Sequence, residues 1–362
     1  MTRLAGRIAR QIEAAGPISV ADYMALCLFD PEDGYYTTRE PFGVDGDFTT
    51  APEISQMFGE LVAVWLHEAW TALGRPSSPV IAEIGPGRGT LMKDMARTLS
   101  RLASSLVRQA RWALVEASPR LAAVQRETLQ AGPAVFTWHE TVATLPSGPL
   151  LIVGNELFDA VPIRQYVKFA QGWRERVVTL DDEGRLVLRA GAGGIDPSYL
   201  PPGAAEAPAG TIAEIAPARA ALMEEIAARI AHERGAGLFI DYGYLRPALG
   251  DTLQALRQHE YDDVLAHPGE ADLTAHVDFH ALAAATRKYG LGAAFLTQGE
   301  FLLGMGLLER AGSLGGNAAL AVRERLSGEV ERLAGPDSMG NLFKAMAVLP
   351  EGVAVHPFPP AH

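Results

Sequence analysis

Residues 80–91 read Val-Ile-Ala-Glu-Ile-Gly-Pro-Gly-Arg-Gly-Thr-Leu, and this stretch decides the fold. Its apolar start predicts a short buried strand, because a strand that is covered on both faces carries a continuous apolar run. The glycines that follow allow a tight turn and let a ligand approach the main chain, which a Cβ atom would block. The stretch therefore predicts a strand, a ligand-binding turn and the start of a helix.

The spacing of the glycines narrows the class of ligand. A dinucleotide-binding fingerprint that begins at Gly85 needs its third glycine at position 90, which is threonine. Glu83, Gly85, Gly87 and Gly89 instead fit the looser acidic-x-Gly-x-Gly-x-Gly loop that is typical of methyltransferases. We expect these four residues to bind S-adenosylmethionine. Another nucleotide and a purely structural turn are the alternatives.

Short apolar runs recur along the chain and alternate with helical stretches, at residues 112–116, 135–138, 150–153 and 237–241. This alternation predicts an α/β fold with a mostly parallel sheet. It is interrupted between residues 161 and 210, where we expect antiparallel strands and then a mobile loop over the Gly/Pro/Ala-rich residues 190–210.

Acidic and aromatic residues follow the next two strands. Glu116 ends the second strand, where an acidic side chain binds the ribose hydroxyls of a nucleotide. After the third strand, Trp138 and His139 are candidates for an adenine pocket. The alternatives are a solvated acid at a helix start for Glu116 and a core position for Trp138.

Polar side chains also follow the fourth strand, at Asn155, Glu156 and Asp159. Because ligands of open α/β sheets bind outside the carboxyl ends of the strands, we expect these residues near the reacting methyl group. The alternative is that they cap a helix or pair with Arg164.

The first 75 residues predict helices. Leu4, Ile8 and Ile12 recur at helical spacing, and Ser19 with Asp22 can cap a second helix. Residues 50–53, Thr-Ala-Pro-Glu, predict a capped start with Glu53 closing a capping box, and one long helix should follow to Trp70.

Composition excludes several classes of protein. The 362 residues carry a net charge of −12 without a Lys/Arg-rich block, so nucleic acid is a poor substrate. No apolar run is long enough for a membrane span. The single Cys27 rules out a disulfide framework and indicates a reducing compartment. We expect a cytoplasmic protein, or one of the mitochondrial matrix if the source is eukaryotic.

Beyond these local signals, the chain resembles the MidA-like family of S-adenosylmethionine-dependent methyltransferases over nearly its whole length. The resemblance implies a Rossmann-like seven-stranded methyltransferase sheet with a helical N-terminal region and inserted strands and loops. The segments that carry it, besides the Glu83–Gly89 loop, are Gly46–Glu60, Leu114–Arg120, Asn155–Ala160, Phe239–Tyr244, Thr274–Phe279 and Met339–Lys344.

A division of the chain follows from the resemblance and the pattern of elements. Residues 1–75 form the helical region that contributes to the donor site. Residues 76–349 form the methyltransferase domain, with insertions at about 163–212 and 243–277. Residues 350–362, which end in Pro-Phe-Pro-Pro-Ala-His, are a tail.

The resemblance also implies roles for residues that composition alone does not single out. The turn at residues 46–50 leads into a helix start where the donor carboxylate can dock. Thr49, Glu53 and Gln56 would then face the same cleft as the glycine loop, with capping and packing as the alternative. His276 and Asp278 would line the pocket or fix a loop rather than bind a metal, and Tyr242 is a candidate substrate contact.

A mitochondrial member of the family dimethylates an arginine of a complex I subunit, so the resemblance implies a protein substrate and arginine methylation. Arginine is a poor nucleophile while protonated, and paired carboxylates can orient it and accept its proton. Glu156 and Asp159 are the first candidates, followed by Glu53 and Asp241. The rival hypotheses are a non-catalytic assembly protein that retains the donor fold and a nicotinamide oxidoreductase.

Overall fold

The computed structural model describes residues 2–39 and 49–360. The chain forms two compact units, each assembled from separated stretches of sequence. Unit 1 contains Met1–Phe48, Phe158–Ala221 and Arg246–Ala281, and unit 2 contains Thr49–Leu157, Leu222–Leu245 and Leu282–His362.

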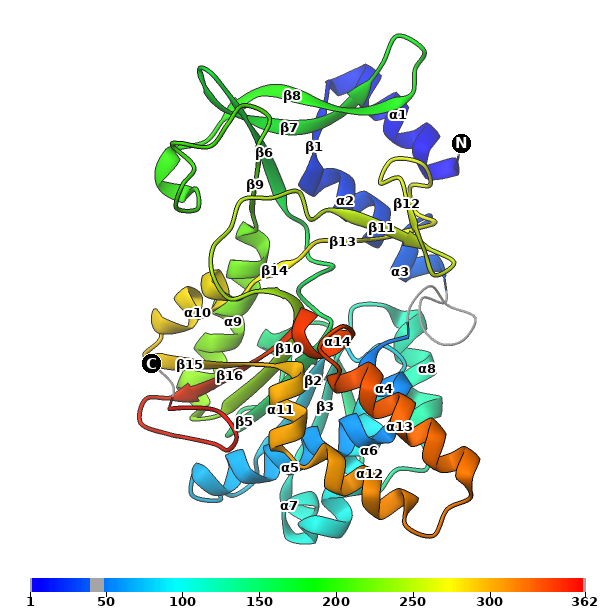
Figure 1. The fold of residues 1–362 in the computed structure, drawn as a ribbon, viewed down its shortest axis with the longest axis vertical. Helices are drawn as coiled ribbons and strands as arrows, with labels where there is room; N and C mark the ends of the chain where they lie inside the picture. The colour runs from blue at the N-terminus through cyan, green and yellow to red at the C-terminus, as the bar shows by residue number, and fades with distance from the viewer. Residues whose placement is uncertain (1, 40–48, 361–362) are drawn as a thin grey trace. The chain divides into compact units, whose positions relative to one another are not determined.

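Unit 2 contains a mixed sheet in which seven strands follow the order β15-β16-β10-β5-β2-β3-β4 (Figure 1). The pairs within the series from β10 to β4 are parallel, whereas β16 pairs antiparallel with both of its neighbours. The strand bounds are β2 Val80–Ile84, β3 Arg111–Val115, β4 Phe136–His139, β5 Leu150–Asn155, β10 Ala236–Tyr244, β15 Leu291–Thr297 and β16 Phe343–Pro350. This is the α/β fold class that the sequence predicted, and the five strands expected from apolar runs are confirmed.

Helices of unit 2 begin where capping residues or turn glycines allow. α6 starts after Gly89, which has a left-handed backbone, and α8 starts with Pro119 after the Ser118 cap. The bounds are α4 Ala51–Ile54, α5 Gln56–Ala72, α6 Thr90–Leu102, α7 Ser104–Gln109, α8 Pro119–Leu129, α11 Gln298–Gly304, α12 Leu307–Gly315, α13 Leu320–Ala334 and α14 Met339–Leu342; a 3-10 turn, η1, spans Val142–Thr144. α9 Pro217–Glu233 and α10 Phe279–Arg287 each contain residues of both units.

The capping box predicted at residues 50–53 is wrong. Thr50 precedes α4, but its side chain accepts no capping hydrogen bond. The Glu53 carboxylate accepts the Thr90 hydroxyl instead of turning back to the helix start. The predicted single helix is interrupted at Ser55, whose extended backbone ends α4 and whose side chain caps α5.

The end of the chain packs into the core of unit 2, in contrast to the predicted tail. Val355 and Phe358 are buried. The Phe358 ring lies 6.1 Å from the ring of Trp65 and 5.6 Å from that of Phe301, measured between centroids. These aromatic contacts bury apolar area that would otherwise face water, so residues 355–358 add to the core.

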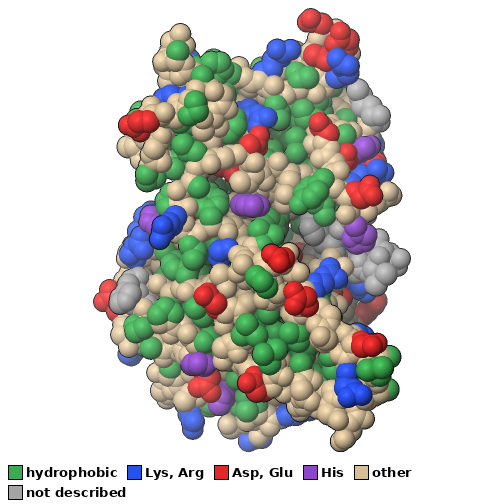
Figure 2. Space-filling model, in the orientation of Figure 1, with side chains coloured by type: hydrophobic (Ala, Val, Ile, Leu, Met, Phe, Trp, Pro, Cys, Tyr) green, Lys and Arg blue, Asp and Glu red, His purple; other side chains and the backbone are tan. Residues whose placement is uncertain are grey.

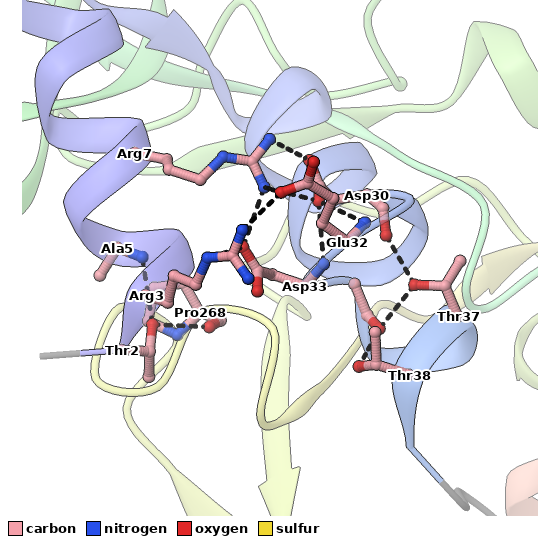
Figure 3. A network of polar contacts seen from close by, with 11 residues as sticks. Thr2, Arg3, Ala5, Arg7, Asp30, Glu32, Asp33, Thr37, Thr38 and Pro268 are labelled. Atoms are coloured by element: carbon pink, nitrogen blue, oxygen red, sulfur yellow. Dashed lines mark hydrogen bonds and ion pairs between the residues drawn. The ribbon is translucent and has the colours of Figure 1, made fainter.

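Unit 1 begins with three helices, α1 Arg3–Ala15, α2 Val20–Phe29 and α3 Tyr35–Thr38. The predicted apolar stripe of α1 is buried, and Ser19 and Asp22 form the predicted capping box of α2. Arg7 joins α1 to the end of α2 through two hydrogen bonds to Asp30, at 2.8 and 2.9 Å (Figure 3). This Arg7 contact holds the pKa of Asp30 below its ordinary value.

The strands of unit 1 other than β14 form two antiparallel sheets. In the larger sheet the order is β1-β7-β6-β9, with β8 paired to β7, and in the smaller it is β12-β11-β13. β8 runs to Gly194, so the predicted loop at 190–210 is strand in its first part. The bounds are β1 Ile18–Ser19, β6 Arg164–Phe169, β7 Gly172–Leu180, β8 Leu186–Gly194, β9 Ile212–Ile215, β11 Gln254–Arg257, β12 Glu260–Asp262, β13 Asp272–Thr274 and β14 Val277–Asp278; a 3-10 turn, η2, spans Pro197–Tyr199.

The two insertions expected from the sequence supply most of the later residues of unit 1. The expected limits of the domains themselves stay a prediction. Figure 2 shows acidic and basic side chains interspersed on the face that it draws, with apolar side chains between them. In the described ranges, every helix is too short or too polar to cross a membrane.

Candidate functional site

The order of the strands in unit 2 marks one place for a ligand. From β2 the chain continues to β3 and β4 on one side, whereas β5 lies on the other side of β2 and leads on to β10. The crevice outside the carboxyl ends of two such strands is where open α/β sheets bind ligands. Gly85 follows β2 and Glu156 follows β5, so the predicted donor loop and the predicted catalytic segment meet at this point.

The glycine loop has the backbone that its composition requires. The φ angles of Gly85, Gly87 and Gly89 are 66°, 52° and 82°, a region that residues with a Cβ atom rarely adopt. A Cβ atom on Gly85 would lie 3.0 Å from Leu157 Cδ1 in the segment after β5. The loop therefore packs closely on that segment, and only glycine fits its conformation without strain.

Glu83 lies inside the sheet beneath this loop. Its side chain is 2% exposed and accepts a hydrogen bond from the backbone N–H of Met92. Burial raises its pKa well above the ordinary value, because the charged form of a carboxyl group loses its hydration there. Its Oε2 atom is buried and has no hydrogen-bond partner among the described residues.

Glu116 follows β3 as predicted and is held in place on both oxygens. Oε1 accepts the backbone N–H of Ser118 at 2.7 Å, and Oε2 accepts Gln125 Nε2 at 2.9 Å. Burial raises the pKa of Glu116, which argues against the alternative of a solvated helix-start acid. The backbone N–H of Glu116 donates to the carbonyl of His139 at 2.8 Å, so these two predicted cofactor residues are neighbours.

Gln125 is a residue of this site that the sequence did not single out. It is fully buried on α8, and its Nε2 also donates to the carbonyl of Gly87 at 2.8 Å. Its Oε1 accepts the indole N–H of Trp138 at 2.9 Å. A glutamine in the middle of a helix gives no local signal, because its partners lie on three other segments of the chain.

Asn155 and Glu156 form the predicted polar end of β5. Asn155 is 8% exposed, and its Nδ2 donates to Glu156 Oε1 at 3.0 Å, whereas its buried Oδ1 has no hydrogen-bond partner in the described part of the chain. The backbone N–H of Ala51 also donates to Glu156 Oε1, at 3.3 Å. Glu156 has a φ of 50°, and non-glycine residues in this region gather at functional sites.

Asp241 and Tyr242 lie near the end of β10. The Asp241 carboxylate is almost fully buried and accepts the backbone N–H groups of Leu157, at 3.1 Å, and of Tyr242, at 2.9 Å. It therefore anchors the turn that carries Glu156. Tyr242 is buried in an edge-to-face contact with Phe343, with 5.3 Å between ring centroids, so its ring belongs to the core. Its contact with the substrate stays a prediction.

Of the residues predicted around the start of α4, two line a cavity and one lies directly before the helix cap. Glu53 and Gln56 line a cavity of about 340 Å³, together with Ile54, Ser55, Leu314, Val322, Arg325, Leu326 and Glu329. Gln56 Oε1 accepts a hydrogen bond from Arg97 at 3.2 Å. Thr49 directly precedes the α4 cap, and residues 46–48 of the predicted carboxylate dock lie outside the described residues. The Ala51 N–H at this start already donates to Glu156.

Three predicted site residues belong to unit 1. The carbonyl of Asp159 accepts Arg219 at 2.9 Å, and the carbonyl of His276 accepts the same guanidinium at 2.6 Å. Asp278 Oδ1 accepts the backbone N–H of Ala281 at 3.0 Å, which makes it a cap of α10. Arg219, which the sequence did not indicate, thus brings Asp159 and His276 together through the backbone.

Arg164, which was the alternative partner for Glu156 and Asp159, binds Glu175 at 2.6 Å. Within the described ranges, no three His, Cys, Asp or Glu side chains lie close enough together to hold a metal ion.

Comparisons with known proteins agree on one family. Residues 61–296 match the family described as "Putative S-adenosyl-L-methionine-dependent methyltransferase". The human "Protein arginine methyltransferase NDUFAF7, mitochondrial" is 35% identical over 371 residues, which cover 94% of this chain and 82% of the human protein. The zebrafish (Danio rerio) protein of the same name is 34% identical, covering 94% of this chain and 86% of its own.

A solved structure supports the same relationship. A COG1565 superfamily member from Burkholderia thailandensis, bound to S-adenosyl-homocysteine, superposes with a TM-score of 0.85. It is 30% identical in sequence, and the match covers 97% of this chain and 92% of that one.

Proposed function

The chain belongs to the S-adenosyl-L-methionine-dependent methyltransferase family, and we propose that it methylates arginine side chains of a protein. The single observation that carries the proposal is the position of Glu156, which has strained backbone and lies beside the glycine loop, where the strand order reverses between β2 and β5. The printed names of the curated relatives, which are arginine methyltransferases, support the choice of acceptor. A respiratory complex I type subunit is the proposed substrate.

The residues of unit 2 fit a methyl donor. The three glycines of the loop have positive φ angles, and the buried atoms Asn155 Oδ1 and Glu83 Oε2 have no hydrogen-bond partner among the described residues, so both could form a hydrogen bond with a ligand. In this proposal the loop lies against the donor, and Glu116 accepts its ribose hydroxyls, since a carboxylate has about four acceptor positions and two of them are taken within the protein. The donor supplies a methyl group that is already activated on a sulfonium.

Arginine sets the demands on the acceptor side. The guanidinium stays protonated near neutral pH, and its lone pairs are delocalised, so one nitrogen must be oriented and relieved of its proton. Glu156 is proposed to bind the guanidinium and to take that proton while the N–C bond forms and the S–C bond breaks. Asn155 and Ala51 orient the Glu156 carboxylate through their hydrogen bonds. The roles of Asp159 as a second catalytic carboxylate, and of Glu53 as a further candidate, stay predictions.

The experiment combines the purified protein, radiolabelled S-adenosylmethionine and an extract of cells that lack this protein. A labelled protein band that contains methylarginine by mass spectrometry, and that disappears with Glu156→Gln, would support the proposal. A label on another residue type would contradict arginine as the acceptor. Binding of the donor without any label would favour the non-catalytic assembly protein.

The compartment is part of the proposal. The curated relatives are named as mitochondrial proteins. We propose the mitochondrial matrix if the source is eukaryotic, and the cytoplasm otherwise. Immunofluorescence or fractionation of the source cells tests this point.

A further inference from the structure

We propose that Gln125 is a positioning residue of the methyl-donor site, which sets the geometry of the Glu116 carboxylate through one side-chain amide. The inference rests on the proposed binding of the donor ribose by Glu116, and it does not depend on arginine as the acceptor.

The geometry joins three parts of the donor site at one side chain. Gln125 Nε2 donates both to Gly87 in the glycine loop, at 2.8 Å, and to Glu116 Oε2, at 2.9 Å. Its Oε1 accepts Trp138 Nε1 at 2.9 Å. Both N–H groups of the amide and one of the two acceptor positions of Oε1 are therefore used inside the protein.

Burial makes this arrangement specific. Gln125 is 0% exposed, and a buried amide without partners would be costly, so its orientation is determined by its three contacts. A Cβ atom on Gly89 would lie 3.5 Å from Gln125 Cγ, which places the side chain directly against the loop. A shift of Gln125 would therefore move both the loop and the carboxylate.

The amide also acts on the protonation of Glu116. Burial raises the pKa of Glu116, whereas the hydrogen bonds from Gln125 and Ser118 and the charge of Arg120 lower it. The ionised form presents only acceptors to the two ribose hydroxyls, and protonation turns one acceptor into a donor. Removal of the Gln125 amide should therefore raise the pKa of Glu116. As the pH is lowered, the variant should then lose its affinity for the donor at a higher pH than the wild type does.

The test measures the affinity for S-adenosylhomocysteine by calorimetry between about pH 6 and pH 8.5. For Gln125→Met we expect roughly 10-fold weaker binding at neutral pH, since a charge-assisted hydrogen bond is lost. The ratio of the variant Kd to the wild-type Kd should increase towards pH 6. Gln125→Glu keeps the acceptor for Trp138 and places a second carboxylate beside Glu116, so it should raise the pKa of Glu116 further than Gln125→Met does. It replaces the methionine variant if that variant does not fold.

Two controls separate positioning from packing. Gln298→Met also removes a buried amide of unit 2, which donates to the carbonyl of Leu333 at 2.8 Å, and should leave the pH dependence unchanged. In a Glu116→Gln background, Gln125→Met should no longer alter the pH dependence, which also separates Glu116 from the nearby His139. A loss of affinity that is equal at every pH, or wild-type affinity in either Gln125→Met or Glu116→Gln, would overturn the proposal.

Discussion

The Asp241 carboxylate accepts the backbone N–H of Leu157 at 3.1 Å, so the end of β10 holds the residue that follows Glu156. The backbone N–H of Glu156 itself donates to the carbonyl of Ile240 at 2.8 Å. Two contacts from one strand thus hold Glu156 in its left-handed conformation. This arrangement makes Asp241 a support for the turn that carries Glu156, and its role as a further catalytic carboxylate stays a prediction.

Asp241→Asn should lower turnover while the affinity for S-adenosylhomocysteine stays close to wild type. The amide has one acceptor oxygen for two backbone N–H groups, so one buried donor loses its partner, at a cost of about 1–3 kcal/mol in unfolding free energy. Asp181→Asn is the control for the loss of a carboxylate charge alone, because Asp181 accepts the backbone N–H groups of Glu183 and Arg185 on Oδ1 only, an oxygen that asparagine keeps. Full turnover in Asp241→Asn would show that the turn is held without it.

Glu156→Gln should keep donor affinity and reduce turnover by roughly 10²- to 10⁴-fold, the usual effect of removing a positioned base. The glutamine can still accept the Ala51 and Asn155 N–H groups, so the fold should be unchanged. Methyl transfer is measured with radiolabelled donor at saturating concentration. Turnover at the wild-type rate would remove Glu156 from the mechanism.

Gly87→Val should abolish binding of S-adenosylhomocysteine in calorimetry and leave the protein folded. A φ of 52° costs a residue with a Cβ atom about 1–2 kcal/mol, and the added atoms would fill the donor cradle. Gly184→Val is the matched control, since Gly184 has a φ of 73° and its Cβ position is open. The control should lose stability in thermal unfolding but bind normally. Normal binding by Gly87→Val would mean that the loop does not contact the donor.

Asp94 should make the protein less stable as the pH rises. Burial raises the pKa of Asp94 from 3.8 to about 6, despite the charge of Arg97. The folded state then binds a proton that the unfolded state has released, so this contribution to stability is present below the unfolded pKa and is lost as the pH rises through about 6. The free energy of unfolding is measured with urea at about pH 5 and about pH 7.5. Between these two values, the wild type should lose about 1 kcal/mol more than Asp94→Asn does. A constant difference would mean that the pKa is not raised.

Local patterns in the sequence predicted the elements that local physics controls. Apolar runs identified strands β2, β3, β4, β5 and β10 because buried parallel strands need them, and the glycine spacing identified the loop because its φ angles exclude other residues. Glu116 and Asn155 were predicted as site residues on similar grounds, since Glu116 follows β3 and Asn155 ends β5, at the edge where ligands of such sheets bind. The family resemblance extended this to the chemistry.

Only the tertiary structure decided which side chains meet. Gln125 contacts Gly87, 38 residues earlier in the chain. Glu53 leaves its predicted capping box for Thr90, and Phe358 enters the core at Trp65 although its surroundings in the sequence resemble a tail. Periodicity reports the face on which a residue lies, but a buried hydrogen bond depends on the packing of distant segments, where every polar group must find a partner at about 3 Å. The sequence therefore determined the sheet and its glycine loop, and packing determined the contacts that hold the candidate site in place.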